Sequence, residues 1–167
     1  ASAAGTEILK KGGNAVDAAV ATGFALAVIY PSAGNLAGGG FMLIHLAKGH
    51  RQVVIDFRET TPAKCTADMF IAPDGSIMSD LGSSRLGWRA SGVPGTVAGF
   101  AKAFQKCGSG QVTWAEVIEP ARRPAEEGHV LTPGVLAQIT ANVDRPSRFA
   151  QSNRTFPHAA ARTQAAA

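Results

Sequence analysis

The residues best suited to chemistry in this chain are Asp56-Phe57-Arg58-Glu59, which follow the apolar run Gln52-Val53-Val54-Ile55. The β-branched composition of that run predicts a strand, and the segment 60–64 after it predicts a loop. A guanidinium at a strand end can meet a planar carboxylate with two parallel N–H donors, which lysine cannot do. Arg58 is therefore the first candidate for binding an amino-acid-like substrate, and Glu59 the second. Alternatively, Arg58 forms an ion pair with Glu59, Asp56 or another acid and only ties the strand end.

A second feature that could contact a ligand is the glycine-rich segment Gly34 to Gly40. In dinucleotide-binding folds such glycines follow a strand and open a helix, whereas these follow a predicted helix and lead into a strand. A P-loop is excluded because the chain contains no Gly-Lys-Ser/Thr sequence. Two interpretations remain open. Either the glycines bring backbone N–H groups close to a substrate, or they form a tight turn packed in the core, and the spacing favours the turn.

No complete pair of nucleophile and base is visible, so we predict no catalytic residue within this chain. His45 lies on a predicted strand and His50 in a predicted turn, and no Gly-x-Ser-x-Gly sequence occurs. Cys65 and Cys107 lack CxxC spacing and a nearby histidine, which argues against a zinc site. We expect no metal and no cofactor. The two cysteines are either a disulfide or, more simply, two free thiols.

Composition limits the class of protein. With 167 residues, 46% of them hydrophobic, the chain fits one domain or a piece of a larger one. The formal charge of +4 sits mostly in residues 142–167, which hold four arginines and one aspartate. A basic tail without an aromatic-interleaved stripe argues against nucleic acid as a partner. No apolar stretch is long enough for a membrane span, and no signal peptide is visible.

The hydrophobic pattern predicts a mixed α and β structure. Asn14 is a good N-cap for a helix over 15–29, and Asp17 stands three residues on in a capping-box position. That helix is apolar on nearly every side, which is typical of a buried helix. The remaining predictions are a helix over 2–11, a β-hairpin over 41–47 and 52–57, a single helical turn over 67–70, and helices over 97–106, 113–127 and 132–141.

Two segments are less regular. Pro120 and Pro124 fall within the 113–127 pattern, and two prolines argue against a regular helix there. After Asn142 the periodicity ends, and we expect the Ala- and Arg-rich residues 142–167 to be disordered.

Several blocks of the chain, taken together, resemble the γ-glutamyltranspeptidase family, also called glutathione hydrolases. The blocks follow one another in the family's order: Gly12-Gly13-Asn14-Ala15-Val16-Asp17-Ala18-Ala19, Ala33-Gly34-Asn35-Leu36, Gly38-Gly39-Gly40-Phe41-Met42, Asp56-Phe57-Arg58-Glu59, Pro62-Ala63-Lys64, Asp68-Met69-Phe70, and Gly92-Val93-Pro94-Gly95-Thr96. The resemblance covers 1–141, as an early segment of the large subunit, and leaves 142–167 unmatched.

The resemblance implies a fold, a reaction and partners. The fold is an α+β, N-terminal nucleophile hydrolase-type αββα sandwich, present here only as a partial piece. The reaction cleaves or transfers the γ-glutamyl group of glutathione and related amides, with amino acids or peptides as acceptors. Self-cleavage of a precursor frees an N-terminal threonine in a small subunit, and that threonine lies outside this chain. The arginine that binds the α-carboxylate in the family corresponds to Arg58. The resemblance also implies that the protein is periplasmic, extracellular or at the cell surface.

Two other interpretations stay open. The chain could be a non-catalytic, truncated remnant of the family with at most residual ligand binding. It could also belong to a related acylase that acts on another amide, although Arg58 in its Asp-Phe-Arg-Glu setting favours glutamyl substrates.

Overall fold

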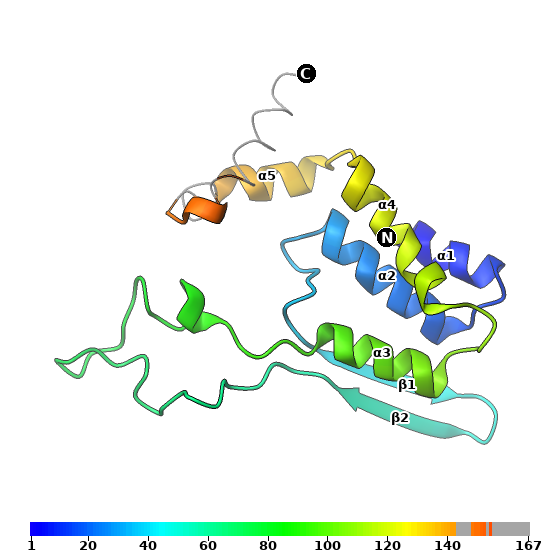
Figure 1. The fold of residues 1–167 in the computed structure, drawn as a ribbon, viewed down its shortest axis with the longest axis horizontal. Coiled ribbons are helices and arrows are strands. Elements are labelled where there is room, and N and C mark those ends of the chain that lie inside the picture. The colour runs from blue at the N-terminus through cyan, green and yellow to red at the C-terminus, as the bar shows by residue number, and fades with distance from the viewer. Residues whose placement is uncertain (143–147, 153, 155–167) are drawn as a thin grey trace.

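The computed structural model describes residues 1–142, 148–152 and 154, and it is a mixed α and β structure (Figure 1). Most expected elements are present within two residues of their predicted bounds. They are α1 (Ser2–Lys10), α2 (Ala15–Ile29), β1 (Phe41–Leu46), β2 (Arg51–Asp56), α3 (Thr96–Cys107), α4 (Trp114–Glu127) and α5 (Pro133–Ala141). The structure adds a 3-10 turn that was not predicted, η1 (Trp88–Ala90). The predicted single helical turn over 67–70 is a hydrogen-bonded turn and no helix.

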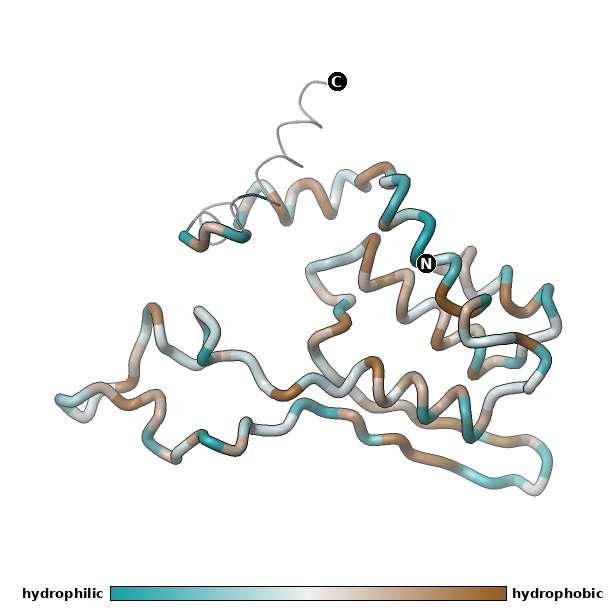
Figure 2. Tube along the Cα trace, in the orientation of Figure 1, coloured by the Kyte–Doolittle hydropathy of each residue, from teal (hydrophilic) through white to brown (hydrophobic). Residues whose placement is uncertain are grey.

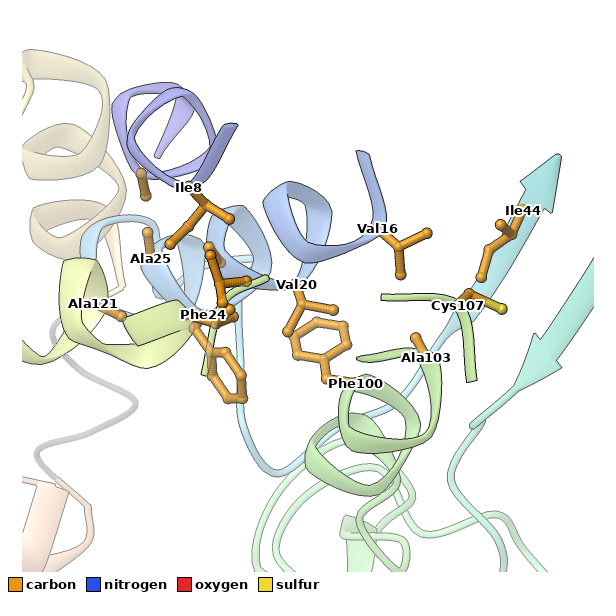
Figure 3. Close-up of a cluster of buried hydrophobic side chains, with 14 of the residues drawn as sticks. Ile8, Val16, Val20, Phe24, Ala25, Ile44, Phe100, Ala103, Cys107 and Ala121 are labelled. Atoms are coloured by element: carbon orange, nitrogen blue, oxygen red, sulfur yellow. The ribbon is translucent and has the colours of Figure 1, made fainter. Parts of the chain in front are cut away.

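Helix α2 is the centre of the hydrophobic core, as its apolar character on all sides predicts. It packs against α1, α3 and α4, and Figure 3 shows its side chains meeting those of the surrounding helices. The ring of Phe24 meets the rings of Phe100 and Trp114 edge to face, with centroids 5.2 and 5.5 Å apart. Because α2 is covered by three helices, it needs no polar face.

The Asn14 and Asp17 pair joins two helix ends. The Asn14 side-chain oxygen accepts the backbone N–H groups of Val16 and Asp17 at 2.8 and 3.1 Å. Oδ2 of Asp17 accepts the backbone N–H of Asn14 and that of Ser109, both at 2.9 Å. The Asn14 amide also donates to the carbonyl of Cys107 at 2.8 Å. The predicted capping box is confirmed, and it also fixes the end of α3 to the start of α2.

We expect Asp17→Ala to lower the free energy of unfolding by about 2 kcal/mol, because Asp17 is 0% exposed and its removal leaves the partly buried N–H groups of Asn14 and Ser109 without this acceptor. Urea unfolding followed by circular dichroism measures this change. Asp74→Ala, at an exposed turn, is the matched control and should change stability by less than about 0.5 kcal/mol. Equal loss in the two variants would contradict a structural role for Asp17.

The β-hairpin presents one face to the helices and one face outward. Ile44 and Ile55 are buried on the inner face, where β2 lies against α3. Leu43 and Val54 are paired on the outer face and are 74% and 66% exposed. Figure 2 shows that the middle of both strands is apolar and the turn between them hydrophilic. The hairpin therefore carries an apolar outer surface on which a further layer can pack.

The prediction that two prolines prevent a regular helix over 113–127 is wrong. Helix α4 is one helix with Pro120 and Pro124 inside it. Its start is fixed by a capping box in which Thr113 and Glu116 bond each other's backbone N–H. Val117 and Pro120 are buried, and α4 packs along α2. Tertiary packing and capping therefore outweigh the loss of the proline hydrogen bonds.

The predicted disorder of 142–167 mostly concerns residues 143–147, 153 and 155–167, which lie outside the described residues. Among the described ones, Arg148 contacts Asp80 through both Nη atoms, at 2.7 and 3.0 Å. This bidentate bond lowers the pKa of Asp80 from its ordinary value. Cys65 and Cys107 are free thiols, half-buried and buried respectively. No described helix is long and apolar enough to cross a membrane.

Candidate functional site

The backbone that carries Arg58 is fixed at the end of β2. Oδ1 of Asp56 accepts the backbone N–H of Arg58 at 3.0 Å, and the N–H of Phe57 donates to the carbonyl of Gly40 at 3.0 Å. The Phe57 ring packs against Phe100, with centroids 5.7 Å apart. The residue before Arg58 is therefore partly buried against the core, while the Arg58 side chain is 64% exposed. This is the rigid frame with a reachable side chain that the sequence predicts.

Three glycines allow the close approach of other segments to Phe57. A Cβ atom on Gly95 would overlap the carbonyl oxygen of Phe57, and one on Gly99 would overlap its ring. A Cβ atom on Gly39 would overlap the same carbonyl oxygen and lie 2.7 Å from the backbone nitrogen of Glu59. Any larger residue would push the strand end away. Gly39 before β1, together with Gly95 and Gly99 at the start of α3, thus allows the packing that fixes the backbone next to Arg58.

The glycine-rich loop connects this strand end to α3. The carbonyl of Gly38 accepts the N–H groups of Gly95 and Thr96 at 2.8 and 3.0 Å. The Thr96 hydroxyl donates to the side-chain oxygen of Asn35 at 3.3 Å. These contacts support the packed-turn interpretation of Gly34 to Gly40. Thr96 is a structural residue at the start of α3 and does not line the site.

A cavity of about 480 Å³ opens beside Arg58. Most of its lining residues belong to the excursion, residues 57–95, over which the chain leaves β2 and returns to α3 (Figure 1). The lining combines cationic, hydroxyl, thiol and apolar groups, and consists of Ala37, Arg58, Glu59, Thr60, Thr61, Pro62, Cys65, Met69, Phe70, Arg89, Ala90, Ser91 and Gly92. Its size is in the range of small-molecule sites.

The ion pair that the sequence allows for Arg58 is present beside this cavity. Its Nε lies 3.4 Å from Oε2 of Glu59, and its guanidinium carbon lies 6.0 Å from the centre of the Phe41 ring. Within the described part of the chain, Glu59 is the only ion-pair partner of Arg58. An exposed pair of this kind contributes little stability and is readily rearranged by a ligand. Arg58 therefore remains available to a carboxylate.

Arg89 is the lining residue that the sequence analysis missed. It lies on η1, and the nearby Val93 donates a backbone hydrogen bond to the carbonyl of Thr60 at 2.8 Å. This bridge joins the two ends of the excursion. No local pattern signals such a long-range contact. His45 and His50 are not among the residues that line the cavity.

A second cavity of about 410 Å³ lies along the excursion. Its lining is mainly apolar and consists of Met78, Leu81, Gly82, Gly87, Trp88, Arg89 and Phe149. Arg89 lines both cavities, and its guanidinium carbon lies 5.8 Å from the centre of the Trp88 ring.

Comparison with known proteins decides the family. The family model described as gamma-glutamyltranspeptidase matches residues 1–165. The chain belongs to the γ-glutamyltranspeptidase family. The match continues past Ala141, which is where we expected the resemblance to end.

Curated relatives and solved structures agree with this family. The chain is 51% identical over 157 residues to a glutathione hydrolase proenzyme of Pseudomonas sp. strain A14, covering 93% of this chain and 26% of the relative. It is 51% identical over 127 residues to that of Escherichia coli K12, covering 76% and 21%. The γ-glutamyltranspeptidase structure of Helicobacter pylori superposes with a TM-score of 0.86 at 40% identity, covering 92% of this chain and 42% of that one.

The chain thus spans about a quarter of the length of the curated relatives it matches. Its fold is a partial piece of the N-terminal nucleophile hydrolase type found in this enzyme family. Acylases are also similar: an Acylase ACY 1 proenzyme of Pseudomonas sp. strain V22 is 43% identical over 150 residues, covering 85% of this chain and 26% of the relative.

Proposed function

We propose that this chain is the substrate-holding segment of a γ-glutamyltransferase or glutathione hydrolase, with Arg58 as the site of the γ-glutamyl α-carboxylate. The observation that carries the proposal is the placement of Arg58, exposed in a cavity on a backbone that packing fixes. A guanidinium supplies paired donors for a carboxylate, and Glu59 beside it offers a negative charge to an α-ammonium group. The pair therefore complements the zwitterionic end of a γ-glutamyl compound.

Binding at Arg58 would position the amide that is cut. The α-carboxylate and the γ-amide belong to one small γ-glutamyl unit, so fixing the first orients the second. We propose that the nucleophile is the N-terminal threonine of a small subunit, outside this chain, whose own α-amine acts as its base. The threonine oxygen forms an ester with the γ-glutamyl group as the amide bond breaks, and the leaving amine takes the proton that the α-amine removed from the hydroxyl. Water then gives glutamate, or an acceptor amino acid or peptide gives a new amide.

This role suggests the remaining partners and the location. Glutathione and related γ-glutamyl compounds are the proposed donors, and a small subunit that carries the threonine is the proposed protein partner. We propose a periplasmic or extracellular location, as the family implies. No residue of this chain is assigned as catalytic.

The test of the proposed function uses γ-glutamyl-4-nitroanilide. A complete, self-cleaved enzyme that contains this segment should release nitroaniline, and the 167-residue chain alone should release none, because the proposed nucleophile lies outside it. Absorbance at the nitroaniline band measures both. Turnover by the purified chain, abolished by Arg58→Ala, would contradict the proposal that this chain only binds the substrate and that the nucleophile lies outside it. An inactive complete enzyme would instead favour a non-catalytic remnant.

A related acylase is a second candidate, because acylase proenzymes match this chain almost as well. The two candidates differ in the acyl group. An acylase of another specificity should cleave an amide whose acyl group lacks the α-carboxylate at least as fast as the γ-glutamyl amide. The proposed enzyme should strongly prefer the γ-glutamyl amide.

A further inference from the structure

Arg89 shares the Arg58 cavity and is held there by backbone contacts. The hydrogen bond from Val93 to Thr60 closes the excursion, and a Cβ atom on Gly92 would lie 2.8 Å from Cβ of Glu59. The segment after Arg89 is therefore packed directly against the segment after Arg58. Arg58 and Arg89 both line one cavity, although their positions in the sequence are far apart.

The charge of the cavity is unbalanced at Arg89. Two arginines and one glutamate line it, and the glutamate, Glu59, is paired with Arg58 at 3.4 Å. Across residues 1–142, 148–152 and 154, Arg89 forms no ion pair, and its contact with the Trp88 ring leaves its charge uncompensated. An exposed guanidinium without an acid in a ligand-sized cavity is suited to an anionic group of a ligand.

We propose that Arg89 binds a second carboxylate of the ligand, so that the cavity favours γ-glutamyl compounds whose leaving group ends in a carboxylate. The proposal rests on the proposed function, which places the α-carboxylate at Arg58. The volume of about 480 Å³ accommodates a ligand longer than one amino acid. The hydroxyl groups of Thr60, Thr61 and Ser91 add hydrogen-bonding capacity in the same wall. Arg89 is thus a specificity residue for the group that leaves.

Cys65 provides a direct reporter of occupancy. It lines the cavity and is half-buried, whereas Cys107 is buried in the core. Modification by N-ethylmaleimide, an uncharged reagent, should therefore occur at Cys65 in the folded protein. An unreacted Cys107 shows at the same time that the core of each variant is intact.

The experiment compares γ-glutamylglycine with γ-glutamylglycine amide, which differ by one carboxylate, as protectants of Cys65. The parent chain should be half-protected by the acid at a concentration about two- to fivefold lower than by the amide, the range of an exposed charge pair. Arg89→Gln should remove this difference. Arg85→Gln removes the same charge from an exposed position that does not line the cavity, and should leave the difference unchanged. In a complete enzyme, KM for the two peptides should follow the same pattern.

The outcomes separate this inference from the proposed function. Equal protection by the two ligands in the parent chain, no protection by either, or a preference that survives Arg89→Gln would overturn the role of Arg89. Arg58→Gln should weaken protection by both ligands. If it changes neither while Arg89→Gln removes the preference, the second anion site stands and the α-carboxylate role of Arg58 is wrong.

Discussion

Arg58→Ala is expected to raise KM for a γ-glutamyl donor by about 10- to 150-fold in a complete enzyme. The change removes a charge-assisted pair of roughly 1.5–3 kcal/mol, and 1.4 kcal/mol corresponds to a factor of ten. If the interaction is equally strong in the ground and transition states, kcat changes little. Initial rates over a range of γ-glutamyl-4-nitroanilide concentrations measure both constants.

Arg58→Lys is the matched control for charge. It keeps the positive charge and loses the bidentate geometry, so its KM should lie between those of the parent and of Arg58→Ala. An unchanged KM in Arg58→Ala would mean that the arginine serves only its ion pair with Glu59.

Gly95→Ala is expected to destabilise the fold by about 3 kcal/mol, near the upper end for overpacking. Its Cβ atom would overlap the backbone carbonyl oxygen of Phe57, and a backbone atom cannot rotate aside as a side chain can. The strand end must therefore move, and Arg58 with it. Urea unfolding measures the stability, and the Cys65 protection assay measures the effect on the cavity.

Gly134→Ala is the matched control, because nothing lies within 4 Å of the added atom in α5. It should be neutral or slightly stabilising, since alanine favours a helix more than glycine does. If Gly95→Ala is as stable as Gly134→Ala, the close packing at Phe57 is not what fixes Arg58.

The elements that the sequence predicts well are those specified by local contacts. Asn14 and Asp17 are close in the chain, and their side chains bond backbone groups of the same turn. The hairpin likewise depends on alternation within two short strands and on the turn between them, where Gly49 has a φ of 81°. Such signals need no knowledge of the rest of the fold.

The features that sequence reasoning missed depend on contacts between distant segments. The prolines of α4 suggest a break, but burial of Val117 and Pro120 on the face toward α2 stabilises the helix. Arg89 becomes part of the site through the bridge between Thr60 and Val93. The glycine blocks are visible in the sequence, but their common target, Phe57, is visible only in the structure.

The central claim is that Arg58 binds the α-carboxylate of the γ-glutamyl group. The most direct test measures kcat/KM of parent and Arg58→Ala enzymes for γ-glutamyl-4-nitroanilide and for 4-aminobutyryl-4-nitroanilide, which lacks that carboxylate. The parent should prefer the γ-glutamyl compound, and Arg58→Ala should lower only that rate constant, so that the preference nearly disappears. A preference of the same size in both enzymes would show that another group binds the carboxylate and would contradict the account.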